Sequence, residues 1–349
     1  MASCSILVIH TGGTIGMTDG PSGLVPDPCF ADRLAPWIAA QRFPARIDVH
    51  PLETLIDSAD ATADHWHTIA RVVVDRHAGF DGIVILHGTD TMAYSASALS
   101  FLLNGLAKPV ILTGAQLPFA TPGTDAERNI SDALAWANHD SIREVCIAFD
   151  GQLLRGNRSV KFSTHVGDGF ASPHWPVLGR SRRGRARAAQ AIEPSALLRP
   201  RPASSLTLSA PDNAVGLLKI YPGLSVRLVQ AAAEAHPSGL VLELYGSGTA
   251  PRLNASLYGT LNDLSRCGLP LVAVSQCTRG AVHQPAYASS HLLRDAGVIF
   301  GHDLTPEAAL TKLSCLVGRG ESKSDLIEAM VTSMAGEMTV PENRDLIAK

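Results

Sequence analysis

The sequence predicts an α/β fold in two domains. We expect a larger N-terminal domain, with a mostly parallel sheet flanked by helices, and a smaller, flavodoxin-like C-terminal α/β domain. Three observations predict this. Short apolar runs typical of buried strands alternate with segments of helical periodicity. The length of 349 residues exceeds the usual size of one domain. A stretch rich in Pro, Ser and Ala separates two such series of segments.

The first strand-like run ends in a turn that carries hydroxyl groups. Residues 6–9 are apolar throughout, as expected of a strand buried on both faces, and Thr11, Gly12, Gly13 and Thr14 follow. Paired glycines permit a tight turn and the close approach of another molecule. Because ligands of open parallel sheets bind at the carboxyl ends of strands, the two hydroxyls mark a candidate site. Taken alone, the same residues equally indicate an ordinary strand, turn and helix start.

A second stretch has the same construction. Residues 83–86 form another apolar run, which leads into His-Gly-Thr-Asp-Thr at 87–91, so Thr89 and Asp90 also stand at a strand end. Between the two stretches, an extended run over 49–60 ends in a polar cluster. Asp57 and Ser58 in that cluster are either site residues or turn residues that bond to their own backbone. The repetition of threonine beside glycine favours a site.

The remaining elements complete two series of strands and helices. Helical spacing is found for Trp66, Ile69, Ala70 and Val73, then for Met92, Ala96, Leu99 and Leu103, and again after Asp125, an expected N-cap. Further strands are expected over 110–112, 145–149, 215–221, 240–245, 271–275 and 298–300. Strands that alternate with helices predict parallel sheets.

Two irregular segments lie near the strand ends. Residues 17–28 are rich in Gly and Pro and follow the Thr14 turn directly, so we expect either a lid over the site or an ordinary surface loop. Residues 156–164 are mostly polar and contain Lys161, for which exposure to solvent is the default expectation.

The domain boundary is predicted from a change of composition. A basic run over 179–187 opens a stretch rich in Pro, Ser and Ala that continues to Pro211. We therefore expect an N-terminal domain over 1–185, a linker over 186–212 and a C-terminal domain over 213–349. The arginines alternatively indicate a nucleic-acid-binding arm, but no aromatic residue lies among them and the net charge of the chain is −3.

Composition narrows the class of protein. Hydrophobic residues make up 46% and charged residues 17% of the chain, which is ordinary for a soluble globular protein. The small negative charge, the lack of a membrane-length apolar run and a start unlike a signal peptide predict neither nucleic-acid nor membrane partners. Six dispersed cysteines without a C-x-x-C pair indicate reduced thiols, so we expect a cytoplasmic protein. His65 and His67 point to different faces of a helix, so no metal site is expected there.

The two threonine motifs together suit acyl transfer from an amide or ester. A threonine hydroxyl is a weak nucleophile until a base removes its proton. Lys161 could be that base if burial makes its neutral form accessible, with Asp90 as the group that polarises it. Backbone N–H groups of a glycine turn could stabilise the oxyanion. The residues alone do not establish that Thr14, Thr89 and Lys161 meet, so this is a hypothesis.

The motifs resemble those of bacterial-type L-asparaginases, and more closely the cytoplasmic type I branch. Thr-Gly-Gly-Thr-Ile-Gly at 11–16 and His-Gly-Thr-Asp-Thr-Met at 87–92 are similar to the two family signatures in sequence, order and separation. Further similarity lies at 56–60, 156–158, Lys161, 170–173, 220–223, 275–277 and 310–313. The resemblance therefore covers nearly the whole chain.

The resemblance implies hydrolysis of L-asparagine to L-aspartate and ammonia without a metal or another cofactor. It implies that Thr14 is the nucleophile, and that Thr89, Asp90 and Lys161 form the triad that handles protons. The α-amino and α-carboxylate groups of the substrate would be held by Asp57, Ser58, Thr89 and Asp90. The resemblance further implies a homodimer or homotetramer, with the active site at a subunit interface.

Three positions depart from the family pattern. Leu24 stands in the region where many members carry a lid tyrosine, which bears on the activation of Thr14. Thr249 stands where an asparagine usually reaches the partner's site, which bears on affinity and on the preference for asparagine over glutamine. Cys277 keeps the Gln-Cys motif near the effector site of some type I members, but Glu243 replaces the expected arginine. We therefore predict weak or absent allosteric activation.

Three alternatives stay open on the sequence. A glutaminase or another small-amide hydrolase would use the same chemistry, because one methylene group changes binding by only about 1–3 kcal/mol. A non-catalytic protein that binds amino-acid amides could keep the fold, although binding alone would not need both threonines, Asp90 and Lys161. A nucleotide-binding protein is disfavoured because neither a phosphate-loop motif nor G-x-G-x-x-G follows a strand.

Overall fold

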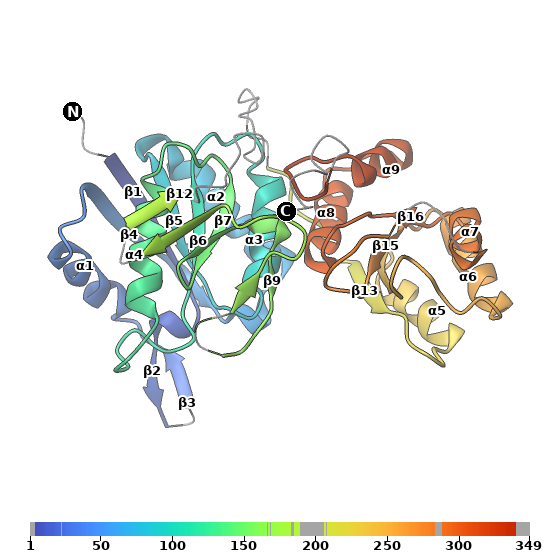
Figure 1. Cartoon of the computed structure of the whole chain (residues 1–349), viewed down its shortest axis with the longest axis horizontal. Helices are drawn as coiled ribbons and strands as arrows, with labels where there is room; N and C mark the ends of the chain where they lie inside the picture. Colours follow the sequence, from blue (N-terminus) through green and yellow to red (C-terminus); the bar gives the residue numbers. More distant parts are fainter. Residues whose placement is uncertain are drawn as a thin grey trace. The chain divides into compact units, whose positions relative to one another are not determined.

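The computed structural model divides the chain into two compact units, Met1–Leu208 and Ser209–Lys349. It describes residues 4–21, 23–165, 167, 169–182, 185–188, 206, 208–282 and 288–339. Each unit has its own sheet and its own helices (Figure 1). The predicted α/β class is confirmed, with a large, mostly parallel sheet in the first unit and a smaller parallel sheet in the second.

An eight-stranded sheet forms the centre of the N-terminal unit. Its order is β12 (Arg185–Ala188), β11 (Gly179–Arg182), β8 (Gln152–Arg155), β7 (Val145–Phe149), β6 (Val110–Thr113), β5 (Gly82–Leu86), β1 (Cys4–Gly12) and β4 (Ala45–Ile56). The strands from β7 to β4 are parallel, whereas β8, β11 and β12 are antiparallel to their neighbours. Because β1, β4 and β5 are parallel neighbours, the turns that follow them meet at one edge of the sheet.

Helices cover this sheet on both sides. They are α1 (Phe30–Ala40), α2 (Ala63–Arg76), α3 (Met92–Leu102) and α4 (Ala126–Ala137). α3 packs against β6 and β7, α4 packs against β5, β6 and β7, and Figure 1 shows the two helices on opposite sides of these strands. α3 is buried almost all round, serines included, so it is an interior helix. Asp125 is the N-cap residue of α4, but its carboxylate accepts the N–H groups of Gln116 and Leu117 rather than one of the helix.

Short elements connect the strands to the site. They are η1 (Thr14–Gly16), β2 (Met17–Gly20), β3 (Gly23–Pro26), η2 (Ser58–Asp60), η3 (His77–Gly79), η4 (Gly156–Arg158), β9 (Val160–Lys161) and β10 (Phe170–Ala171). The segment expected to be a lid or a loop forms an antiparallel hairpin, β2 with β3, that projects from the N-terminal unit (Figure 1). β2 begins directly after η1, so the hairpin and the Thr14 turn are continuous.

Part of the basic run belongs to the sheet. β11 pairs with β8, and β12 pairs with β11, so composition alone misplaced the start of the connection. Gly179 makes this pairing possible, because a Cβ atom there would lie 2.2 Å from the ring of Trp136. Of the predicted linker over 186–212, residues 189–205 and 207 lie outside the described residues.

The C-terminal unit is a parallel sheet covered on both faces. Its strands are β13 (Val215–Lys219), β14 (Gly239–Leu244), β15 (Leu271–Ser275) and β16 (Ile299–Phe300), and its helices are α5 (Val226–Ala235), α6 (Ala255–Arg266), α7 (Ala288–Asp295), α8 (Pro306–Gly318) and α9 (Lys323–Val331). Alternate residues of β14 serve opposite faces: Leu240, Leu242 and Leu244 pack with α5, α6 and α7, while Val241 packs with α8 and α9. Burial on both faces explains the continuous apolar runs that predicted these strands.

A fully buried ion pair joins α8 to the segment after α9. Lys312 Nζ lies 2.6 Å from Glu337 Oε1, and neither side chain is exposed. Lys312 also donates to the carbonyl oxygens of Met330 and Thr332, at 3.4 and 2.7 Å. Glu337 accepts the backbone N–H groups of Met334 and Ala335. The burial of two charges is tolerated because each has several partners.

Candidate active site

The first turn lies between the ends of two neighbouring strands. Gly12 and Gly13 have positive φ angles of 122° and 85°. A Cβ atom on Gly12 would lie 2.3 Å from the carbonyl oxygen of Ile56, and one on Gly13 would lie 2.3 Å from the nitrogen of Gly88. Only glycine therefore allows the turn to touch both neighbours. Thr14, the next residue, is partly buried beside this contact.

The second turn is fixed by a buried histidine. His87 Nδ1 lies 2.7 Å from the carbonyl oxygen of Gly88, and its Nε2 lies 2.9 Å from Ser95 Oγ on α3. A carbonyl can only accept, so Nδ1 carries the proton and Nε2 accepts the hydroxyl hydrogen. Burial lowers the pKa of His87, which keeps the ring neutral in this arrangement. The histidine thereby anchors the peptide that precedes Thr89 to α3.

The residues at the end of β4 form the third side of the candidate site, next to the two turns. The Asp57 side chain is exposed, and its Oδ1 accepts the Ala59 N–H at 3.0 Å. Ser58 is buried, and its carbonyl oxygen accepts the hydroxyl of Thr91 at 2.7 Å. Its own hydroxyl oxygen lies 2.3 Å from the position that a Cβ atom on Gly88 would occupy. Ser58 is therefore packed against the second turn, and the exposed Asp57 directly precedes it.

Lys161 reaches this cluster from β9. Its Nζ lies 3.0 Å from Thr89 Oγ1 and 2.5 Å from Asp90 Oδ1. Thr89 is buried, the Lys161 side chain is 19% exposed and that of Asp90 is 64% exposed. The amine thus contacts both a hydroxyl and a carboxylate while solvent still reaches the pair. Lys161 is not the surface lysine that composition suggested.

The predicted residues fall into two groups. Thr14, Asp57, Ser58, Thr89, Asp90 and Lys161 gather at the carboxyl ends of β1, β4 and β5 in the N-terminal unit. Cys277 and Thr249 belong to the C-terminal unit. The N–H of Cys277 donates to Ser275 Oγ at 3.0 Å, and the backbone of Thr249 forms a bridge with Tyr245. Glu243 pairs with Lys219, with 3.4 Å between Nζ and Oε2.

Two residues that shape the site were not predicted. Ser95 holds His87, and Thr91 binds the backbone of Ser58. The only sequence signal for Ser95 is that it is one of three serines, with Ser97 and Ser100, in a helix that is otherwise mostly apolar. No cluster of three or more His, Cys, Asp or Glu side chains suited to a metal ion occurs among the described residues.

Comparison with known proteins identifies the family. The model of the asparaginase N-terminal domain matches residues 5–193, and that of the glutaminase/asparaginase C-terminal domain matches residues 214–330. This chain belongs to the asparaginase family. The resemblance drawn from the threonine motifs is thereby confirmed.

Individual relatives agree with the family models. L-asparaginase 1 of Escherichia coli K12 is 37% identical over 345 residues, which cover 97% of this chain and 99% of that protein. The 60 kDa lysophospholipase of Mus musculus is 36% identical over 96% of this chain and 63% of its own length. The crystal structure of L-asparaginase I from Vibrio cholerae superposes with a TM-score of 0.85 at 34% identity and covers 97% of this chain and all of that one. The chain is therefore an enzyme, a hydrolase of the asparaginase family, as predicted.

None of the described helices of this asparaginase-family enzyme combines the length and the apolar character that crossing a membrane requires.

Proposed function

We propose that this enzyme hydrolyses L-asparagine to L-aspartate and ammonia through an ester formed on Thr14. The observation that carries the proposal is the position of the Lys161 amine, which contacts Thr89 Oγ1 at 3.0 Å and Asp90 Oδ1 at 2.5 Å beside the Thr14 turn. A hydroxyl, an amine and a carboxylate in contact have the composition of a proton-transfer triad.

The first half of the reaction forms the ester. Thr14 Oγ1 attacks the side-chain amide carbon and loses its proton, the C–N bond breaks, and the proton leaves with the nitrogen as ammonia. Backbone N–H groups of the glycine turn stabilise the oxyanion that develops. A bare threonine hydroxyl is a weak nucleophile, so this step needs a neighbouring group to take its proton.

The second half cleaves the ester. Thr89 orients a water molecule, whose proton passes through the Thr89 hydroxyl to the amine of Lys161. The water oxygen attacks the ester carbon, Thr14 leaves and regains a proton, and aspartate is released. Asp90 stabilises the positive charge on Lys161 each time the amine takes a proton.

Substrate binding is assigned to the residues around the triad. Asp57 and Asp90 carry exposed carboxylates suited to an α-ammonium group. Ser58 and Thr89 supply hydroxyls, and α3 begins directly after this turn, so its N-terminal N–H groups favour a carboxylate nearby. Together these groups match the two ends of a free amino acid.

Ammonia release from L-asparagine and from L-glutamine tests the proposal. Thr14→Ala is expected to lose at least about 10³-fold in kcat. Thr18→Ala, on the hairpin, is the matched control and is expected to stay within about twofold of wild type. Mass spectrometry of quenched enzyme should show an aspartyl adduct that Thr14→Ala lacks. Activity that survives in Thr14→Ala would remove Thr14 from its role, and a higher kcat/KM for glutamine would make the enzyme a glutaminase.

We further propose a cytoplasmic homodimer or homotetramer, supported by the similarity to type I enzymes. Light scattering after size-exclusion chromatography would measure the number of chains.

We also propose little or no activation by asparagine, because Glu243 replaces an arginine near Cys277. A sigmoidal dependence of rate on asparagine concentration would contradict this.

A further inference from the structure

A buried histidine lies next to the turn that carries Thr14. His10 belongs to β1, directly before the turn at 11–14, and it is 1% exposed. Among the described residues its Nε2 atom has no hydrogen-bond partner. Buried polar side-chain atoms are mostly hydrogen-bonded, so an imidazole nitrogen without a partner at this position needs an explanation other than the stability of the fold.

The Nε2 edge of the ring faces the end of the turn. A Cβ atom on Gly16 would lie 2.5 Å from His10 Nε2 and 2.9 Å from His10 Cε1, closer than real Cβ atoms approach other atoms. Gly16 is not among the glycines with a positive φ angle. Contact with the ring, and not the backbone conformation, therefore excludes a side chain at position 16.

Other aromatic side chains hold the ring in place. The centroid of the His10 ring lies 4.6 Å from that of Phe30, the first residue of α1, at an interplanar angle of 53°. Phe30 meets Phe119 edge to face at 5.8 Å, and Phe119 meets Trp37 at 5.5 Å. His10 and Phe30 are each 1% exposed, so neither ring has free space into which it could turn.

The turn that rests on this ring is closed by backbone hydrogen bonds. The N–H of Gly16 donates to the carbonyl oxygen of Gly13 at 3.0 Å, which closes the loop around Thr14. The carbonyl oxygen of Gly16 accepts the N–H of Asp27 at 2.9 Å, at the base of the hairpin. A shift of Gly16 therefore moves Thr14 and the base of the hairpin together.

The ring is uncharged at neutral pH. Burial lowers the pKa of His10 from 6.5 to about 4. An uncharged imidazole can lie against a phenyl ring and backbone atoms without a counter-ion. A group with so low a pKa is a poor proton acceptor at pH 7, so His10 is not suited to activate the Thr14 hydroxyl directly. Its influence on the reaction passes through the position of the turn.

We propose that His10 is a positioning residue for the Thr14 nucleophile. The contact between its Nε2 edge and Gly16 sets the position of the Thr14–Gly16 turn relative to β1, and thereby the direction of the Thr14 hydroxyl. Because a displacement of a reacting group by about 1 Å can cost roughly 10²-fold in rate, a small shift of this turn is sufficient to slow the reaction. The role of Thr14 rests on the proposed function, whereas the support of the turn by His10 does not.

Two substitutions with the same chemistry and a different reach test this role. The amide of His10→Gln extends to the position of Nε2, whereas that of His10→Asn ends near the position of Nδ1, and both bury one amide. We expect His10→Gln to keep kcat for ammonia release from L-asparagine within about threefold of wild type. His10→Asn should lose about 10–10²-fold in kcat, with KM changed by less than about twofold, because the substrate-binding groups stay in place. Equal kcat values for the two variants would overturn the proposal.

A compensating pair of substitutions gives a second test. Gly16→Ala places a methyl group against the ring and should lower kcat at least about tenfold, and Gly16→Ala/His10→Ala, which removes the ring, should recover at least about threefold. Gly79→Ala is the matched control, because nothing lies within 4 Å of its Cβ position, and it should stay within about twofold of wild type. A double variant no more active than Gly16→Ala would also overturn the proposal. Should Gly16→Ala not fold, the two His10 amides decide alone.

Hydrogen exchange separates this inference from the proposed function. Exchange over 13–17 should be faster in His10→Asn than in wild type and unchanged in His10→Gln, because the hydrogen bond from Gly16 to Gly13 opens more often without the support. This result together with the absence of an aspartyl adduct on Thr14 would reject only the proposed function. Identical exchange over 13–17 in all three proteins would reject the support of the turn by His10.

Discussion

Each unit holds a lysine paired with a carboxylate, and the two pairs differ in their surroundings. Lys161 lies 2.5 Å from Asp90, and Lys312 lies 2.6 Å from Glu337, so the pairs are alike in length. The first pair is open to solvent on the Asp90 side, and its lysine also contacts the hydroxyl of Thr89. The second is buried, and its remaining hydrogen bonds go to backbone groups.

The difference shows that the partners and the solvent exposure of a charged pair, and not its length, distinguish a pair suited to proton transfer from one that only stabilises the fold. Backbone partners cannot exchange protons with a substrate, so the buried pair can only hold segments together. A hydroxyl partner and access to solvent leave the Lys161 pair free to take up and return a proton. The distance between the charges carries no such information.

The largest expected effect comes from Lys161→Met. We expect kcat for ammonia release to fall about 10²–10⁴-fold, because the proposed proton acceptor is lost. The melting temperature should change little, since partly exposed pairs contribute about 0–1 kcal/mol. Partial recovery of activity with added alkylamines would support proton transfer. A Lys161→Met variant with the kcat of wild type would contradict a catalytic role for the Lys161 pair.

Lys312→Met is expected to have the opposite profile. Removal of one partner leaves Glu337 buried and uncompensated, which costs about 3–5 kcal/mol in the free energy of unfolding measured with urea. Lys312→Met/Glu337→Leu should recover part of that loss, because no lone charge is then buried. A double variant as unstable as the sum of both single variants would contradict this account.

Glu307 lies in the same C-terminal unit as Glu337, but it forms no ion pair with a lysine among the described residues. Among the described residues its Oε2 has no hydrogen-bond partner, and burial raises its pKa from 4.5 to about 7, with a smaller contribution from Glu243. The native state therefore keeps a proton that the unfolded chain has lost between those values, so this group lowers stability as pH rises from 4.5 to about 7. Glu307→Gln should gain stability relative to wild type over that range, by up to about 3 kcal/mol. Urea unfolding at several pH values measures it, and a difference independent of pH would refute it.

The smallest effect is expected at Lys219. Its amine lies 3.4 Å from Glu243, and its side chain is 60% exposed. Lys219→Met should change the free energy of unfolding by less than about 1 kcal/mol, because solvent screens exposed pairs. A loss as large as that of Lys312→Met would show that exposure does not separate the two kinds of pair.

Local features of the site could be predicted from the sequence. Gly12, Gly13 and the threonines lie within a few residues of strand ends, where backbone requirements and hydroxyl chemistry are both visible. The partner of Lys161 was not visible in this way, because 72 residues separate it from Thr89. Family resemblance supplied that link, and the roles of these residues stay proposals.

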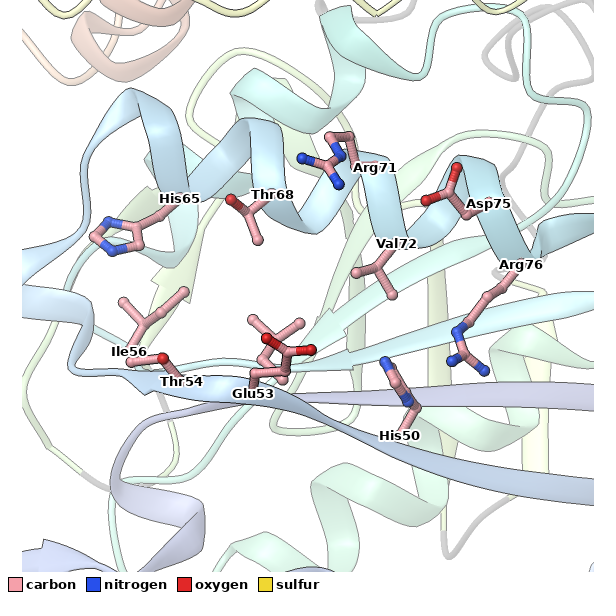
Figure 2. A pocket seen from close by; sticks show the side chains of 11 residues that line it. His50, Glu53, Thr54, Ile56, His65, Thr68, Arg71, Val72, Asp75 and Arg76 are labelled. Carbon is pink, nitrogen blue, oxygen red and sulfur yellow. The ribbon is translucent and has the colours of Figure 1, made fainter.

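Features that depend on distant packing were missed. The arginines of β11 indicated a connection, but pairing with β8 placed them in the sheet. Helical spacing identified the buried face of α2 and gave no information about β4, which faces Thr68 and Val72 of the same helix (Figure 2). Lys312 is fully buried although lysines are usually exposed, and only its contact with Glu337 explains this.

The contact between Gly13 and Gly88 limits how this enzyme can be engineered. Any side chain at position 13 would collide with backbone atoms of the neighbouring turn, and one at 88 would collide with Ser58. Saturation libraries should therefore hold both codons fixed and place their diversity on the hairpin around Leu24, which is 46% exposed. Directed evolution of amide selectivity can therefore vary the exposed hairpin but not the two glycines.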